Sequence, residues 1–308
     1  MNGIQKTIIS SFQDVESFTL KEAVNEVNSR LHVKNASIRA RIYEGIEKGI
    51  FEKVDRGVYR VEKDGKACVC ILGDGRNLAN ISDGSIDAVV TDHPYEDKKA
   101  HKGGNRNFTS SYECFRYSEE DFVEKARILK DGGFLCEFLP DEAETNFEYL
   151  YDIKKMAEAA GLNYYATVPW KKGKFVANTG RKAKAFEQIV IFTKGKARAL
   201  RPNVKQDLAD PSVRHYMSGT AKMLPIMFDF DPPSKRERTH QAEKPVELLI
   251  ELLSYITLPG DTVIDQFAGS GNLGRAALRS GRNSILFEKD EGIYTQMKKN
   301  IEKELLIN

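Results

Sequence analysis

Two short loops in this chain carry the side chains that could do chemistry. One is Thr91-Asp92-His93-Pro94-Tyr95, after the apolar run 86–91, and the other is Asp265-Gln266-Phe267-Ala268-Gly269-Ser270-Gly271, after the apolar run 262–264. Apolar runs rich in Val and Ile are typical of strands buried in a parallel sheet. Ligands of such sheets bind beyond the carboxyl ends of the strands, where the strand order reverses. We therefore expect both loops to line one crevice.

The second loop has the spacing of a nucleotide-binding turn. Residues Gly269 to Gly274 read G-x-G-x-x-G, and Glu288 follows Gly269 by 19 residues at the end of an apolar run. By itself this spacing also fits a nicotinamide dinucleotide. Asp265, however, stands just before the glycines, where its charge would repel a pyrophosphate at the helix N-terminus. A cationic donor without phosphate, S-adenosylmethionine, fits better, with Asp265 near its positive charges and Glu288 accepting from the ribose hydroxyls.

Several segments together resemble the amino-group DNA methyltransferases. Residues 263–271 resemble the cofactor motif of that family, and Asp92-His93-Pro94-Tyr95 resembles its D-P-P-Y catalytic loop. Residues 240–257 resemble the segment that packs beside the methionine end of the donor, and residues 71–74 resemble the opening strand and acidic turn. The catalytic loop precedes the cofactor motif, which is the order of the β class. The likeness covers residues 68–305, roughly, and leaves out the N-terminal part.

The resemblance implies a Rossmann-like methyltransferase fold, an α/β domain with a mostly parallel, doubly wound sheet and a circularly permuted motif order. It also implies S-adenosylmethionine as the cofactor. The residues that match cofactor-binding positions are Asp265, Phe267, Ala268, Gly269, Ser270, Gly271, Asn272, Glu288, Lys244, Pro245 and Asp74. For Asp74, a role in the turn Gly73-Asp74-Gly75 is an alternative. Gln266 replaces a proline that is usual in the family, which alters the rigidity expected of this loop.

The resemblance also assigns roles to the catalytic loop, Asp92, His93, Pro94 and Tyr95. The exocyclic amine of a base is a poor nucleophile because its lone pair is delocalised into the ring, and hydrogen-bond acceptors correct this as charge develops. In the family the first residue accepts with its side chain, the second accepts with its backbone carbonyl, and the aromatic residue stacks on the flipped base. His93 replaces a usual proline, and we expect its ring to pack rather than to act as a base. Taken singly, Asp92 and Pro94 could instead shape a turn and Tyr95 could be a core residue.

The function expected from the resemblance is site-specific methylation of DNA at adenine N6. An aspartate at the head of the loop accompanies adenine more often than cytosine in this family. The alternatives within methyl transfer are cytosine N4, or an RNA or protein amide, as the acceptor. A non-catalytic DNA-binding regulator that senses the donor, and an oxidoreductase, are the alternatives from other classes. The implied partner is double-stranded DNA, and the resemblance also allows a homodimer and a cognate nuclease of a restriction-modification system.

Positive charge is concentrated in one segment. Residues 171–205 hold eleven Lys or Arg and one acid, a local charge of +10, so the rest of the chain sums to −8. Such segregation suits a phosphate backbone, although a solvated lysine-rich surface would look the same. The DNA-binding candidates are Lys171, Lys172, Lys174, Arg181, Lys182 and Lys184 in this segment, with Arg39 and Arg41 nearer the N-terminus.

Residues 1–62 are expected to form a separate small module. Hydrophobic periodicity predicts helices at 18–28 and 37–49, and strands at 50–54 and 57–61 that form a hairpin. The first helix begins at a capping box, Thr19 with Glu22. Two helices followed by a two-stranded wing resemble a winged helix-turn-helix, in which Arg39 and Arg41 would face DNA, although such modules also bind proteins.

Strands and helices alternate from residue 69, so residues 63–308 are expected to form the methyltransferase domain. The expected strands are 69–72, 86–91, 134–139, 164–168, 187–193, 262–264 and 284–287, and the expected helices are 118–129, 146–160 and 246–257. Residues 196–239 show no periodicity and are predicted to be a target-recognition insertion, since long irregular segments in compact domains are usually functional or disordered.

Length and composition fit a globular enzyme. The chain has 308 residues, of which 41% are hydrophobic, enough for a large core. It has no apolar run near the ~20 residues of a membrane span and no signal-peptide pattern, so we expect a cytoplasmic protein. The four cysteines have neither disulfide nor zinc spacing, which predicts reduced thiols and no metal site.

Overall fold

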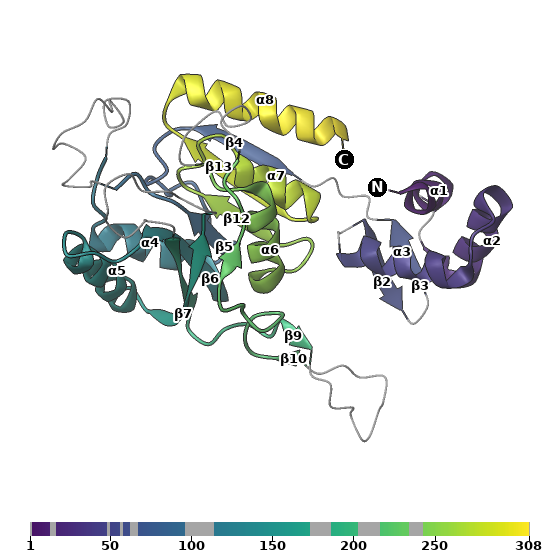
Figure 1. The fold of residues 1–308 in the computed structure, drawn as a ribbon, viewed down its shortest axis with the longest axis horizontal. Helices are drawn as coiled ribbons and strands as arrows, with labels where there is room; N and C mark the ends of the chain where they lie inside the picture. The colour runs from purple at the N-terminus through teal and green to yellow at the C-terminus, as the bar shows by residue number, and fades with distance from the viewer. Residues whose placement is uncertain are drawn as a thin grey trace, which may run out of the picture.

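The computed structural model describes residues 2–12, 17–47, 50–55, 58–61, 67–95, 114–172, 186–202, 216–233 and 243–307. Figure 1 shows two parts, an N-terminal group of helices with a small sheet and a larger α/β unit. No described helix is long and apolar enough to cross a membrane. No disulfide links the cysteines of the described residues, and among them Cys136 is fully buried.

The N-terminal group contains helices and an antiparallel sheet of order β1-β3-β2. Its elements are α1 (Gly3–Phe12), β1 (Phe18–Thr19), α2 (Leu20–Leu31), α3 (Asn35–Glu47), β2 (Phe51–Asp55) and β3 (Val58–Val61). The capping box is present, because Thr19 Oγ1 accepts from the Glu22 N–H at 3.2 Å and Glu22 Oε2 accepts from the Thr19 N–H at 2.6 Å. The two predicted helices and two hairpin strands are confirmed within a few residues. The hairpin turn lies outside the described residues, and α1 was not predicted.

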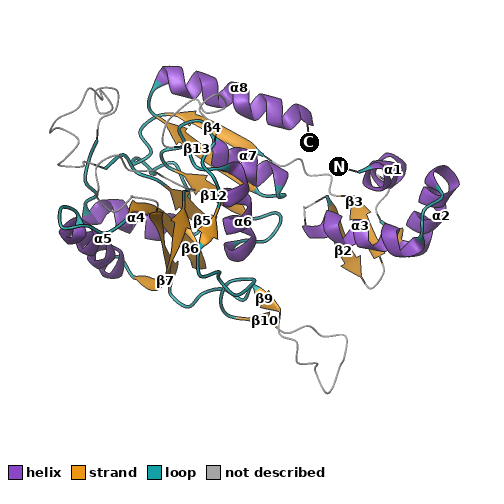
Figure 2. Ribbon diagram, viewed as in Figure 1, coloured by secondary structure: helices purple, strands orange, loops and turns teal. Residues whose placement is uncertain are grey.

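The larger unit is built on one twisted sheet of order β11-β7-β8-β6-β5-β12-β13-β4 (Figure 2). The strands are β4 (Cys68–Leu72), β5 (Ile86–Thr91), β6 (Leu129–Pro140), β7 (Leu162–Lys171), β8 (Phe186–Lys194), β11 (Phe228–Asp229), β12 (Thr262–Asp265) and β13 (Asn283–Glu288). Strand β8 is antiparallel to both of its neighbours, and every other pairing in the sheet is parallel. The predicted mostly parallel α/β fold is confirmed.

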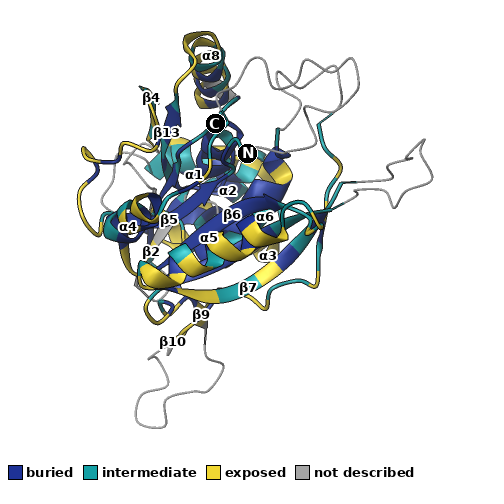
Figure 3. Ribbon diagram, turned by 90° about the vertical axis from the view of Figure 1, so that its left-hand side faces the viewer, coloured by how far each residue is buried: buried dark blue, intermediate teal, exposed yellow. Residues whose placement is uncertain are grey.

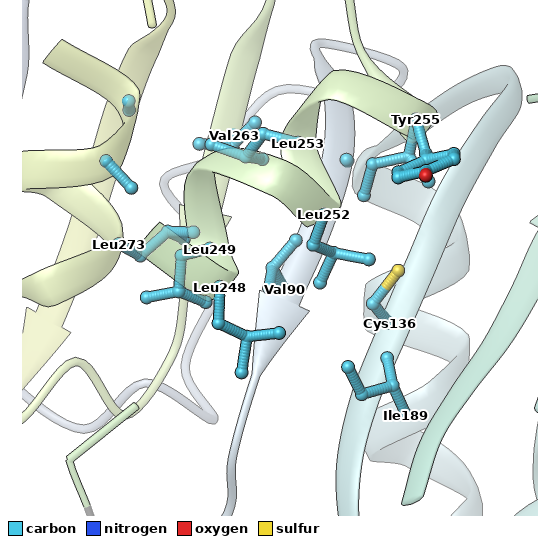
Figure 4. Packing of buried hydrophobic residues seen from close by; sticks show 14 of the residues in the cluster. Val90, Cys136, Ile189, Leu248, Leu249, Leu252, Leu253, Tyr255, Val263 and Leu273 are labelled. Carbon is cyan, nitrogen blue, oxygen red and sulfur yellow. The ribbon is translucent and has the colours of Figure 1, made fainter. Parts of the chain in front are cut away.

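Helices cover both faces of this sheet. In Figure 3 the central strands are coloured as buried. The helices are α4 (Glu119–Ile128), α5 (Phe147–Ala159), α6 (Val246–Ile256), α7 (Asn272–Arg279) and α8 (Glu291–Ile307). The side chains of β6 alternate: Cys136 packs with α6 and α7 on one face, and Leu135 packs with α4 and α5 on the other. Figure 4 shows the first of these layers, with Leu248 and Leu252 of α6 over the sheet. The sheet is therefore doubly wound.

The predicted insertion differs from an irregular loop. Its described residues include a short antiparallel pair, β9 (Arg201–Pro202) and β10 (Tyr216–Met217), and they add β11 to the edge of the main sheet beside β7. The strands predicted at 134–139 and 164–168 are longer in the structure, where they are β6 and β7. Strand β6 begins at Leu129, before a register shift opposite Ile86 to Ala88, and β7 extends to Lys171 because it pairs along its whole length with β8.

A fully buried ion pair joins α4 to the sheet. Lys125 Nζ lies 2.5 Å from Glu137 Oε1, and both side chains are 0% exposed. Tyr117 Oη donates to Glu137 Oε2 at 3.2 Å, and the same ammonium lies 3.5 Å from the Tyr117 ring centroid. Burial lowers the pKa of Lys125 and raises that of Glu137, so each charge depends on the other.

Lys125→Met should destabilise the protein strongly because it leaves Glu137 buried without its cation. We expect a loss of about 3–5 kcal/mol, or a Tm lower by about 6–20 °C in a thermal melt of the full chain. The double variant Lys125→Met/Glu137→Leu should recover most of that loss, since both charges are gone. The control Lys155→Met breaks an exposed pair with Glu158 on α5 and should change Tm by less than about 3 °C. Equal losses in the single and double variants would contradict this account.

Candidate active site

The two loops singled out in the sequence leave neighbouring strand tips. Strands β5 and β12 are parallel partners, with Ile264 opposite Val89, and the order of strands along the chain reverses between them. Thr91 Oγ1 at the end of β5 donates to Asp265 Oδ1 at the end of β12 across 3.0 Å. Asp92 is the next residue after Thr91. The expected crevice at the switch point thus has a carboxylate on each side.

The glycine turn after β12 leads into α7. Gly269 and Gly271 have φ values of +51° and +82°, in the left-handed region that suits glycine. The Gly269 N–H donates to Glu288 Oε2 at 3.0 Å, which ties the turn to the end of β13. A Cβ on Gly271 would lie 2.7 Å from Met297 Cγ, whereas a Cβ on Gly269 would meet no atom within 4 Å. The turn is therefore packed on its α8 side and open at Gly269.

Other residues of the predicted cofactor loop hold the turn in place. Ala268 is buried, and its N–H donates to the Phe287 carbonyl at 2.8 Å. Ser270 is also buried, and its carbonyl accepts from Asn300 of α8. The Phe267 ring lies 5.4 Å from the Phe115 ring, centroid to centroid.

Two carboxylates with raised pKa values flank this turn. Burial raises the pKa of Asp265 to about 7, against the opposing effect of hydrogen bonds from the Phe267 N–H and Thr91. Burial also raises the pKa of Glu288, although it accepts from the Gly269 and Asp290 N–H groups. Ionised carboxylates in such a position favour a cationic ligand over a phosphate.

The turn at Asp74 lies against the cofactor loop. Gln266 Nε2 donates to the Gly75 carbonyl at 2.7 Å, and a Cβ on Gly75 would lie 1.8 Å from the Gln266 carbonyl oxygen. The Gly73 N–H donates to the Glu288 carbonyl at 2.9 Å. Asp74 itself is exposed, and its Oδ1 accepts from the Arg76 N–H at 3.0 Å. The described contacts of Asp74 are those of a turn residue placed beside the cofactor loop.

The segment before α6 approaches the catalytic loop. Lys244 Nζ lies 2.5 Å from Asp92 Oδ2 and 3.1 Å from Glu187 Oε2. The Lys244 carbonyl accepts from Asn272 Nδ2 at 2.9 Å, and Pro245 is the N-cap of α6. Of the predicted cofactor residues, Lys244 and Asn272 thus join the first turn of α7 to the catalytic loop.

His93 is buried in an aromatic cluster. Its Nε2 lies 2.8 Å from Tyr149 Oη, and its ring centroid lies 4.0 Å from that of Tyr117. Tyr149 Oη accepts from the Tyr117 N–H, so its own hydrogen is available to His93 Nε2. Burial and the nearby Lys125 charge lower the pKa of His93 well below its ordinary value. A neutral, packed ring agrees with the structural role expected for it.

Pro94 and Tyr95 continue the loop away from the strand. The Pro94 carbonyl accepts from the Phe115 N–H at 3.0 Å, and Tyr95 forms a single bridge with Phe115. Tyr95 is partly exposed, and its ring centroid lies 5.7 Å from that of His93. Because the Tyr95 ring is partly exposed, it can stack against a ligand.

The predicted DNA-binding residues divide into three groups. Lys171 and Lys172 are already paired, with Asp229 at 2.7 Å and with Glu187 respectively. Arg41 pairs with Glu44 in α3, and Arg39 is exposed on the same helix. The remaining candidates, Lys174, Arg181, Lys182 and Lys184, lie outside the described residues.

One residue of the site, Glu187, was not predicted from the sequence. It forms ion pairs with both Lys172 and Lys244 and so lies one residue away from Asp92 in a chain of ion pairs. The signal was present in the sequence, because Glu187 is the single acid of the basic segment 171–205.

Comparison with known proteins agrees with this geometry. The profile of a DNA methylase family, the N6/N4 methyltransferases, matches residues 86–299, which include both loops. The chain belongs to this family. The type II methyltransferase M.MjaI of Methanocaldococcus jannaschii is 25% identical over 265 residues, which cover 72% of this chain and 87% of the relative.

Solved structures share the fold of this methyltransferase. The M1.HpyAVI–SAM complex covers 76% of this chain and 99% of its own, at 21% identity and a TM-score of 0.52. PvuII DNA methyltransferase, described as cytosine-N4-specific, covers 79% of this chain and 92% of its own, at 16% identity and a TM-score of 0.54. The residues present at the turn fit S-adenosylmethionine, the cofactor expected from the sequence: carboxylates flank the turn, and Gly269 leaves an open approach.

Donor binding should weaken at low pH because Asp265 must be ionised to attract a cation. With its pKa at about 7, Asp265 takes up a proton as the pH falls below that value, and affinity for S-adenosylmethionine should then decline. We expect calorimetry to show up to tenfold weaker binding per pH unit between about pH 7 and pH 5.

Asp265→Asn should bind weakly at high pH and lose this dependence. The control Asp152→Asn alters an exposed carboxylate on α5 and should follow the wild-type curve. A wild-type affinity that stays flat across this range would contradict the assignment of Asp265 to the donor's positive charge.

Proposed function

We propose that this methyltransferase transfers a methyl group from S-adenosylmethionine to the N6 amine of adenine, in specific sites of double-stranded DNA. The observation that carries the proposal is the position of Asp92, which directly follows β5 beside the cofactor loop. An aspartate at this point supplies a full negative charge as an acceptor for an amine N–H. The nature of this residue also favours adenine over cytosine, by resemblance to the family.

The chemistry requires acceptors on the amine rather than a covalent intermediate. S-adenosylmethionine supplies an electrophilic methyl group. As the N–C bond forms and the S–C bond breaks, the sulfur keeps the electron pair and one amine proton leaves to solvent. The Asp92 carboxylate and the His93 carbonyl accept the two N–H groups, which draws them out of the ring plane and frees the lone pair. Tyr95 stacks on the adenine, which is flipped out of the duplex at a cost of a few kcal/mol.

We further propose how the protein holds the duplex. Lys174, Arg181, Lys182 and Lys184 bind phosphates, and residues 196–239 recognise the target site. Residues 1–62 form a winged-helix module that contacts DNA through Arg39, and residues 63–308 form the methyltransferase domain. The separate hydrophobic core of the N-terminal group, centred on Phe18 and Ile42, supports this division.

Asp92→Ala should abolish transfer without preventing donor binding, because the variant loses an acceptor on the amine and keeps the cofactor loop. The assay incubates the protein with labelled S-adenosylmethionine and duplex DNA, digests the product to nucleosides and separates them. We expect label in N6-methyladenine with the wild type and a loss of about 10²–10³-fold in Asp92→Ala, the range found when one group that stabilises the transition state electrostatically is removed.

The control for this test, Asp152→Ala, removes an exposed aspartate of α5 and should keep wild-type activity. Label in N4-methylcytosine would replace the base assignment. Full activity of Asp92→Ala would exclude the proposed mechanism altogether.

Replacing Arg181, Lys182 and Lys184 together by Ala should weaken binding to all duplexes alike. Each cation removed from a phosphate should reduce the slope of log affinity against log salt by about 0.9. Fluorescence anisotropy at several salt concentrations measures both quantities. The control replaces Lys155, Lys299 and Lys303, three exposed lysines elsewhere, and removes the same net charge. If both triple variants bind duplexes equally weakly, the segment has no special role.

A further inference from the structure

Lys244 reaches the active site from the start of α6 with its charge directed at Asp92. Its Nζ lies 2.5 Å from Asp92 Oδ2 and 3.1 Å from Glu187 Oε2, and its side chain is 9% exposed. The other oxygen of Glu187 pairs with Lys172. The charges therefore alternate from Lys172 through Glu187 and Lys244 to Asp92, which brings a cation against the residue that the proposed function makes the amine acceptor.

We propose that Lys244 is a positioning residue for methyl transfer: with Glu187 it fixes the orientation of the Asp92 carboxylate and keeps it ionised. This inference rests on the proposed function, and it assigns Lys244 to the acceptor side of the site rather than to the donor. Lys244 holds Oδ2, and Oδ1 is the oxygen assigned to the amine N–H.

Without Lys244 the surroundings of Asp92 would be mostly negative. The charged groups that face it are Lys244 before α6, Lys172 after β7, Glu187 on β8, Glu137 on β6 and Asp265 on β12. Glu137 is neutralised by its own partner on α4. Removing the Lys244 charge would leave Asp92 facing two other carboxylates and a lysine of weaker influence, and a protonated Asp92 accepts an N–H poorly.

The titration behaviour of the group agrees with this geometry. Burial raises the pKa of Asp92, and the Lys244 charge opposes that rise. Burial lowers the pKa of Lys244, but Asp92 and Glu187 outweigh burial and hold it above its ordinary value. Burial raises the pKa of Glu187, yet Lys244 and Lys172 outweigh it and keep Glu187 ionised. Lys244 is thus a permanent cation shared between two carboxylates.

The position of Lys244 is itself fixed by its surroundings. Its ammonium lies 5.2 Å from the Phe138 ring centroid and 5.8 Å from that of Trp170, and both rings are buried. Its carbonyl accepts from Asn272, the first residue of α7. Since α7 follows the glycine turn, the same backbone contact sets the cofactor loop and the lysine that orients Asp92. A lysine that served only as a surface charge would need neither anchor.

Single-turnover methylation by the full-length enzyme, followed against pH with labelled donor and duplex DNA, tests the role of Lys244. Lys244→Met should move the acid limb of the rate profile upward by at least about one pH unit, and so lower the rate about tenfold or more at pH values below the wild-type limb. Lys244→Arg keeps the positive charge, so the acid limb of its rate profile should lie close to that of the wild type. Glu187→Gln removes a negative charge near Asp92 and should move the limb downward.

Donor affinity separates a positioning role from a binding role. By calorimetry, S-adenosylmethionine should bind Lys244→Met within about threefold of wild type, a difference below 1 kcal/mol. The control Lys155→Met should leave both the rate profile and the affinity unchanged. Loss of donor affinity in proportion to the rate, with an unmoved pH profile, would make Lys244 a donor ligand and overturn the proposal.

Other outcomes of these experiments also test the proposed role of Lys244. If Lys244→Met does not fold, the direction of the Glu187→Gln shift carries the test, and an upward or absent shift overturns the proposal. A wild-type enzyme that binds the donor but methylates no duplex would instead defeat the proposed function, before any variant is compared. Methylation of cytosine rather than adenine would change the substrate and leave the role of Lys244 to be judged by the same profiles.

Discussion

The parallel pairing of β5 with β12 brings together two carboxylates at adjacent strand tips, Asp92 after β5 and Asp265 at the end of β12. Asp92 and Asp265 repel each other there, and burial raises the pKa of both. The two carboxylates have different partners, which reduce the cost of this repulsion in different ways. Asp265 has a hydroxyl and a backbone N–H, which leave it a pKa of about 7, whereas Asp92 has the ammonium of Lys244. One carboxylate is left to respond to a cationic ligand, and the other is held ready as an acceptor.

Side-chain hydrogen bonds stabilise the two loops at positions where the family motif usually has proline. At His93, the ring is held by Tyr149 inside the aromatic cluster. At Gln266, the amide donates to the Gly75 carbonyl and joins the cofactor loop to the first turn of the domain. Proline restricts a loop by fixing its own φ, whereas these residues restrict it through contacts with other elements. The rigidity of each loop therefore depends on the packing of α5 and of the turn at residues 73–75.

Much of this site follows from the sequence because the relevant rules are local. Apolar runs before Asp92 and Asp265 predict buried strands, and parallel strands end at the same edge of a sheet, so the two loops could be placed together. This rule does not predict the position of Glu187, because strand β8 is antiparallel to its neighbours and begins, rather than ends, at that edge. Glu187 lies near the start of β8, at the edge of the sheet where the parallel strands end. Its position there follows from the pairing of β8 with β6 and β7, which the sequence does not show.

Other departures have equally physical causes. Lys171 and Lys172 look like free cations in the sequence, but folding pairs them with Asp229, from the edge strand β11, and with Glu187. Helix α1 was missed because its apolar residues, Ile4, Ile8 and Ile9, are β-branched and are interspersed with Thr and Ser, which favour helices weakly. Its contacts with α2 and α3 supply the stability that the local sequence lacks.

The raised pKa of Asp265 also links the active site to the stability of the whole domain. In the unfolded chain this group ionises near its ordinary value of 3.8, but in the folded protein it keeps its proton up to about pH 7. Between these values the unfolded state loses the proton first, so stability falls as the pH rises through that window and stays reduced above it. A bound cation offsets the loss, since it interacts with the ionised carboxylate only in the folded state. The charge of Asp265 therefore couples donor binding to folding.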